Sequence, residues 1–162
     1  MDAQLPDLYA ATSARLVGLL TAMGGSAEDA EDAEEVCQEA WARLVVRWEK
    51  VRGYDDPEAW VRGVAVRLLI SRRRRRTVAA RLLPVLASRA VVAEPSAAAV
   101  DLSAALAVLP LEQRAVVVLH HALDLPVEEV ARVLEIPVGT VKSRLSRGRA
   151  ALAAVLSEEV TP

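Results

Sequence analysis

The hydrophobic positions of the chain recur with the three-to-four-residue period of an α-helix along most of its length. In the first half the period holds from about residue 5 to 23, then from 33 to 48, and a third run begins at Pro57. Proline suits a first helical turn. Gly24-Gly25 and the segment 53–57 interrupt the period. The first half therefore predicts three helices joined by two turns.

The start of the second of these helices is acidic. Ser26 and Asp29 have the spacing of a capping box, and the acids that follow suit the positive end of a helix dipole. We therefore expect residues 28–32 to be a capped helix start that faces solvent.

The periodicity weakens between Pro84 and Val100, where the sequence reads PVLASRAVVAEPSAAAV. Prolines and small residues of this kind predict a linker, and Asp101 has the character of the N-cap of a new helical unit. The predicted fold class is all-α, with two small helical domains at residues 1–81 and 101–162 joined by a linker at 82–100.

The second domain contains LDLPVEEVARVLEIPVGTVKSRLSRGRAALAAVL at 123–156. The pattern predicts a short helix over 127–134, a tight turn over 135–137 and a second helix from about 138. This is the helix-turn-helix arrangement, whose second helix enters the major groove of DNA. An ordinary helical hairpin with a solvated basic face explains the same pattern without DNA. Within the pattern, buried faces are expected for Val127, Val130, Ala131, Leu134, Val141, Leu145 and Leu152, and an exposed polar face for Lys142, Ser143, Ser146 and Arg147.

Charge is strongly segregated along the chain. The formal net charge is −2, yet residues 60–81 hold eight arginines and no acid, and residues 138–149 hold four basic residues and no acid. A local positive field attracts a polyanion whatever the net charge is. The five consecutive arginines at 72–76 therefore predict contact with nucleic acid, with a merely solvated helix end as the alternative. We expect this run to bury little surface and to be dispensable for folding.

The chain offers no convincing catalytic or metal-binding constellation. His120 and His121 are adjacent, so on a helix they point about 100° apart. Cys37 has no histidine near it in sequence, and there is no glycine-rich phosphate loop. We expect no enzymatic activity, no metal and no cofactor. No apolar run reaches the roughly 20 residues of a membrane span, so we expect a cytoplasmic protein without membrane insertion.

Two motifs give the chain a family resemblance. IPVGTVKSRLSRGRAAL, which begins at Ile136, resembles the signature of region 4 of sigma-70-type RNA polymerase sigma factors. EEVCQEAW at 34–41 is similar to the Asp-x-x-Gln-Glu-x-Phe stretch of region 2, and Trp60-Val61, Val64-Ala65 and the arginine run resemble the rest of that region. With two such domains and a short linker, the chain resembles the extracytoplasmic-function group.

The resemblance implies core RNA polymerase and promoter DNA as partners, and it leaves room for an anti-sigma factor. Domain 1–81 would bind core polymerase and the promoter −10 element, and domain 101–162 would bind the −35 element. The residues that would contact polymerase are Glu35, Gln38, Glu39 and Arg43. The residues that would meet the −10 element are Tyr54, Trp60, Arg62, Arg67, Ser71, Arg72, Arg73, Arg74, Arg75 and Arg76. The residues that would meet the −35 element are Thr140, Lys142, Ser143, Arg144, Ser146, Arg147 and Arg149.

Physical roles differ within these sets. Arginines can neutralise phosphates, and Trp60 or Tyr54 can stack on an unpaired base, although a tryptophan at helical spacing also suits a core. Arg147 is the best placed residue for a bidentate contact to guanine, whereas Arg144 and Arg149 lie at the flanks, toward phosphates. Arg67 and Ser71 stand where the family has asparagine and aspartate, so the resemblance does not specify the −10 sequence.

Two other classes of function fit parts of the pattern. One is a stand-alone helix-turn-helix regulator whose first half senses a ligand or dimerises. The other is a non-catalytic adaptor whose basic helices bind an acidic partner. The second basic island at 60–81 is more than a simple dimeric repressor needs, and co-purification with core polymerase separates these classes from a sigma factor.

Overall fold

The computed structural model describes residues 4–25, 27–82, 102 and 104–159. Within these ranges every regular element is a helix, and the chain divides into two compact units between Val91 and Val92. The prediction of an all-α chain with two small helical units is confirmed. The predicted linker lies outside the described residues except for Leu82, which is still helical, and Asp101 lies outside them too.

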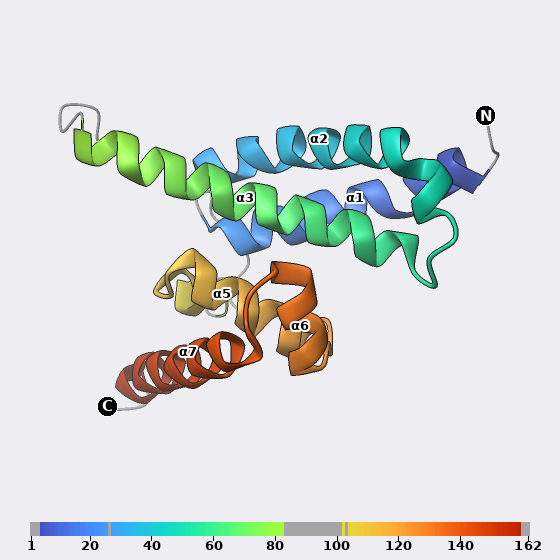
Figure 1. Cartoon of the computed structure of the whole chain (residues 1–162). Coiled ribbons are helices and arrows are strands. Elements are labelled where there is room, and N and C mark those ends of the chain that lie inside the picture. The colour runs from blue at the N-terminus through green and yellow to red at the C-terminus, as the bar shows by residue number, and fades with distance from the viewer. Residues whose placement is uncertain (1–3, 26, 83–101, 103, 160–162) are drawn as a thin grey trace. The chain divides into compact units, whose positions relative to one another are not determined.

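The first unit is a bundle of the three predicted helices, α1 (Gln4–Gly24), α2 (Ala27–Val51) and α3 (Pro57–Leu82). Figure 1 shows α2 and α3 side by side, and α1 packs against both of them. Because only residues 52–56 separate α2 from α3, the two helices run antiparallel. The largest fully buried side chains of this unit are Leu20, Met23, Val36, Leu44, Val51, Val61, Val66 and Leu69.

The turns of the first unit follow local rules that the sequence carries. Gly25, which follows α1, has a φ of 79°, a backbone conformation that glycine adopts without strain. Asp56 caps α3, because its Oδ1 accepts a hydrogen bond from the backbone N–H of Ala59 at 2.9 Å. Ser26 lies outside the described residues, whereas Asp29 packs directly against Gly24, where a Cβ would clash with it.

The second unit contains α5 (Leu111–Val117), the π-helical turn η1 (Val118–Ala122), α6 (Val127–Leu134) and α7 (Val138–Glu159). Helix α7 packs against α5 and α6. Gly148 allows the approach to α5, because a Cβ at this position would lie 2.7 Å from Cγ2 of Val117.

The helix-turn-helix is confirmed with its predicted bounds. Helix α6 is followed by a left-handed residue, Glu135 with a φ of 54°, and α7 begins at Val138 directly after Pro137. Two side chains predicted to be buried, Val127 and Leu152, are only half-buried. The side chains buried between or beneath the two helices are Val130, Ala131, Val133, Leu134, Val141 and Leu145.

Candidate nucleic-acid and polymerase interfaces

Helix α7 presents a polar outer face. Val141 and Leu145 are 0% and 4% exposed and fix the inner face of the helix. The four residues predicted for the outer face are all exposed: Lys142, Ser143, Ser146 and Arg147. The orientation is therefore as predicted, and short serines between two long cations leave room for a close approach to base edges.

Arg144, predicted at the flank of this face, makes an ion pair within the unit. Its Nη2 lies 2.8 Å from Oε2 of Glu112 in α5, and its side chain is only 19% exposed. Arg144 therefore joins α7 to α5, and its guanidinium is engaged inside the unit.

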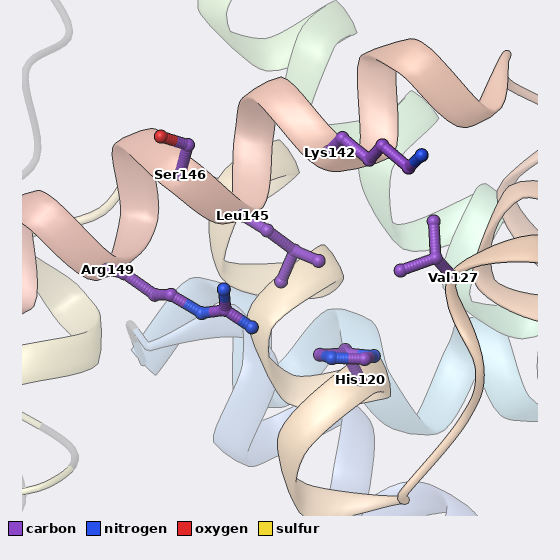
Figure 2. Close-up of a pocket in the computed structure, with 6 residues that line it drawn as sticks. All are labelled: His120, Val127, Lys142, Leu145, Ser146 and Arg149. Atoms are coloured by element: carbon purple, nitrogen blue, oxygen red, sulfur yellow. The ribbon is translucent and has the colours of Figure 1, made fainter.

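A shallow cavity of about 340 Å³ lies beside the outer face of α7 (Figure 2). Lys142, Ser146 and Arg149 line it from α7, together with Leu145. His120 from η1 and Val127 at the start of α6 complete the lining. The cavity thus connects the polar face of α7 with the first helix of the helix-turn-helix.

The two adjacent histidines hydrogen-bond to different partners, and only His120 lines this cavity. The Nδ1 of His120 lies 2.8 Å from the carbonyl oxygen of Leu125, so Nδ1–H donates this hydrogen bond. Arg149 donates from Nε to Nε2 of His121 at 3.2 Å. Because a guanidinium N–H can only donate, Nε2 of His121 accepts this bond. Burial, and next the positive charge of Arg149, lower the pKa of His121, which favours the neutral ring.

Thr140 stands at the start of α7. It is half-buried, and its carbonyl oxygen accepts a hydrogen bond from the hydroxyl of Ser143 at 3.1 Å. Ser143 remains exposed despite this local bond.

Helix α3 divides the −10 candidates between two faces. The helical period places Trp60, Arg67, Ser71 and Arg74 on one stripe, with Arg75 at its edge. Ser71, Arg74 and Arg75 are exposed, whereas Trp60 and Arg67 are half-buried. Tyr54, in the turn before the helix, is 41% exposed. The exposed members of this stripe are accessible to a polyanion.

The other face of α3 carries Arg73 and Arg76 toward α2. Nη1 of Arg73 lies 2.6 Å from Oδ2 of Asp29, and Arg76 bonds the other oxygen of the same carboxylate. Arg76 also lies 3.0 Å from Asp32. Asp29 is 0% exposed. Its burial is tolerable because two guanidiniums compensate the carboxylate charge. Arg62, half-buried, lies on the same side of α3.

Arg72 faces three acids of α2. Its guanidinium lies 2.7 Å from Glu35, 3.4 Å from Asp32 and 3.5 Å from Glu39. The hydrogen bond to Glu35 raises the pKa of Arg72 above its ordinary value, so this side chain stays charged. Its side chain is 24% exposed and that of Arg76 is 33% exposed, so the expectation that the run buries little is wrong for both.

The same interface includes two of the four candidates for polymerase binding. Glu35 and Glu39 bind Arg72, and Glu39 also pairs with Arg43 at 2.7 Å. Gln38 is exposed. It lines a separate groove of about 230 Å³ between α1 and α2, next to Trp41 and Cys37.

Sequence reasoning missed the acidic residues of α2 that bind the arginines of α3. It gave residues 28–32 a capping role only, whereas Asp29 and Asp32 are the partners of Arg73 and Arg76. The signal that could have found them is register, because in an antiparallel helix pair the residues at equal distance from the turn face each other. Asp32 and Arg76 each lie 22 residues from Tyr54.

Two further observations concern membrane spans and metal sites in the described part of the chain. No helix there is long and apolar enough to cross a bilayer. The same residues contain no group of three histidine, cysteine or acidic side chains placed to hold a metal ion.

Comparison with known proteins identifies both units. Residues 8–78 match the family described as sigma-70 region 2, and residues 99–152 match sigma-70, region 4. The RNA polymerase sigma-E factor of Streptomyces antibioticus is 34% identical over 140 residues, which are 83% of this chain and 76% of that protein.

The ECF RNA polymerase sigma factor SigE of Mycolicibacterium smegmatis is 34% identical over 129 residues, which are 73% of this chain. The match spans about half, 49%, of that relative's length. The fold is similar to that of the sigma factor RpoE from Bartonella quintana, solved in complex with the anti-sigma factor NepR. That likeness has a TM-score of 0.79 at 19% identity and covers 96% of this chain and 98% of the other. The chain belongs to the sigma-70 family of RNA polymerase sigma factors, in its extracytoplasmic-function group.

Proposed function

We propose that the chain is a dissociable subunit of RNA polymerase that binds the core enzyme and directs it to specific promoters. The observation that carries this proposal is the presence of two separate basic surfaces on two units. One is the outer stripe of α3, and the other is the outer face of α7 with its four exposed polar residues. A stand-alone regulator needs only the second, whereas a promoter with two spaced elements needs both.

We assign the −35 element to α7 and the −10 element to α3. Lys142 and Arg147 would read or hold DNA in the major groove, with Ser143 and Ser146 between them. On α3, Arg74 and Arg75 would meet phosphates beside the site where the strands separate, and Trp60 or Tyr54 would shelter an unpaired base.

We assign polymerase binding to the exposed side of α2 around Gln38. This side chain is the member of the candidate set for which the structure gives a position on an open groove, whereas Glu35, Glu39 and Arg43 also take part in ion pairs. Family membership makes an anti-sigma factor a further partner to test for. The proposed role is binding without catalysis, in the cytoplasm, where core polymerase and promoter DNA are found.

Reconstitution tests the proposal. The purified chain is mixed with core polymerase, and run-off transcripts are selected from a library of promoter fragments. We expect specific initiation from fragments that share two spaced elements. A chain that neither co-purifies with core polymerase nor supports initiation would exclude the proposal and favour a stand-alone regulator.

A single substitution locates the polymerase surface. Gln38→Ala should weaken core binding without loss of helicity, because the side chain is exposed on α2. Gln4→Ala makes the same chemical change at an exposed position of α1 and should leave core binding unchanged. Equal affinities of both variants and the parent chain would move the polymerase surface away from Gln38.

A further inference from the structure

The basic face of α3 and the acidic face of α2 form ion pairs with each other within the first unit. Arg72, Arg73 and Arg76 make ion pairs with α2 carboxylates. Arg74 and Arg75, between them in sequence, are exposed on the other side of the helix. The run of five arginines is thus two sets, one that makes ion pairs with α2 and one that is exposed.

The three arginines that pair with α2 differ in how deeply their contacts are buried. Asp29 is fully buried beneath Arg73 and Arg76, so these contacts belong to the core of the unit. Of the three acids that hold Arg72, Asp32 belongs with these inner contacts, because its side chain is only 22% exposed and also binds Arg76. The other two contacts are more open, because the side chain of Glu35 is 71% exposed and that of Glu39 is 39% exposed. Such an ion pair is weak enough to exchange for a different partner.

Arg72 therefore connects the two surfaces of the proposed function, on which this inference rests. Its partners Glu35 and Glu39 stand on the helix assigned to polymerase, and Arg72 itself stands in the run assigned to DNA. Carboxylates and a phosphate compete for the N–H donors and the positive charge of one guanidinium, so a guanidinium held by carboxylates is less available to a phosphate.

We infer that Glu35 and Glu39 act as an internal counter-charge that withholds Arg72 from DNA in the free chain, and that a partner bound at these two acids releases it. Polymerase that engages Glu35 and Glu39 would free Arg72 for a DNA phosphate. DNA that captures Arg72 would in turn free the two carboxylates for polymerase. The two binding events then favour each other, as linkage requires.

The test begins with the free, full-length chain and a short fluorescent DNA duplex of random sequence. Glu35→Gln with Glu39→Gln removes the counter-charge and keeps the side-chain shapes. Glu34→Gln with Glu49→Gln changes net charge equally at two exposed positions of the same helix, and neither residue has an ion pair with Arg72 in the structure. Both double variants should bind DNA more tightly than the parent chain because their net charge is less negative. The release of Arg72 is therefore measured by the difference in DNA affinity between the two variants.

We expect the Glu35/Glu39 variant to bind the duplex about two- to fivefold more tightly than the control variant, the range of an exposed ion pair. Its log–log salt dependence should be steeper by about 0.9, which corresponds to one added phosphate contact. In an Arg72→Gln background the difference between the two variants should disappear. Equal affinities and equal slopes for the two variants would overturn the inference.

A second arm separates this inference from the proposed function. If the parent chain binds core polymerase and initiates transcription while the two variants bind DNA alike, the counter-charge is wrong and the sigma-factor function stands. If the parent chain does not bind core polymerase, the function fails, and the DNA measurement on the free chain still decides whether Glu35 and Glu39 withhold Arg72.

Discussion

Arg144 and Glu112 form an ion pair of 2.8 Å that joins α7 to α5. Both side chains are more than two-thirds shielded from solvent. The pair fixes the rotation of α7 against α5, so one of the arginines of the family-like motif serves the fold.

We expect Arg144→Ala to lower the stability of the second unit by about 1 kcal/mol, because a partly buried pair loses one partner. The charge reversal Arg144→Glu with Glu112→Arg should recover most of this loss. All three tryptophans, Trp41, Trp48 and Trp60, lie in the first unit, so the urea transition seen by tryptophan fluorescence should stay in place while the transition seen by circular dichroism shifts. Failure of the reversal to restore stability would show that Arg144 does not act through Glu112.

Arg147 should behave as a residue that reads sequence. Its side chain is exposed on the outer face of α7, and Arg147→Ala should cost roughly 1–3 kcal/mol on the preferred −35 element and relax the preference at one base pair. Arg149→Ala should weaken all sequences about equally and lower the salt slope by about 0.9. Selection of randomised −35 sequences with each variant compares the two, and an unchanged consensus for Arg147→Ala would place the reading face elsewhere.

Gly148 marks the close approach of α7 to α5. Gly148→Ala should destabilise the second unit by about 1–3 kcal/mol, because the new Cβ would meet Cγ2 of Val117 at 2.7 Å. Gly139→Ala is the matched control in the same helix, since a Cβ there meets nothing within 4 Å. The control should be neutral or stabilising by up to about 1 kcal/mol. Denaturation followed by circular dichroism should separate the two variants, and equal stabilities would mean that the helices adjust without cost.

The arginine run should divide into a structural and a dispensable set. Arg73→Gln with Arg76→Gln leaves the buried carboxylate of Asp29 without these two partners and should cost about 2–3 kcal/mol, somewhat less than a fully buried pair because both arginines are partly exposed. Arg74→Gln with Arg75→Gln should change stability by no more than about 0.5 kcal/mol. Tryptophan fluorescence in urea measures the first unit directly. Equal losses for both variants would contradict the division.

Periodicity predicted the helices of both units well, because an amphipathic pattern and a helix stop depend on neighbouring residues alone. Pro57, Gly25 and the turn before Val138 gave boundaries that the structure confirms. The exposed face of α7 followed for the same reason, since Val141 and Leu145 can only point inward.

Pairing between elements was the part that local pattern could not supply. Local pattern predicts a capping role for Asp29 and a phosphate contact for Arg144, because each role is typical of that residue type at that position. Their partners, Arg73 and Glu112, are 44 and 32 residues away and become neighbours only when helices pack. Charge counts along a chain therefore overstate how many cations are open to DNA.

The buried Arg114 determines which residues near the start of the second unit can vary in sequence. Its guanidinium donates to the main-chain oxygens of Leu106 and Leu109 at 2.8 Å and of Ala107 at 3.3 Å. Because main-chain oxygens are present whatever side chain is attached, substitutions at the exposed position 107 leave this contact intact. A change at Arg114 removes all three bonds at once. Residues 104–109 can therefore diverge in their outward side chains, while Arg114 holds their main chain beside the buried Ala105 and Leu109.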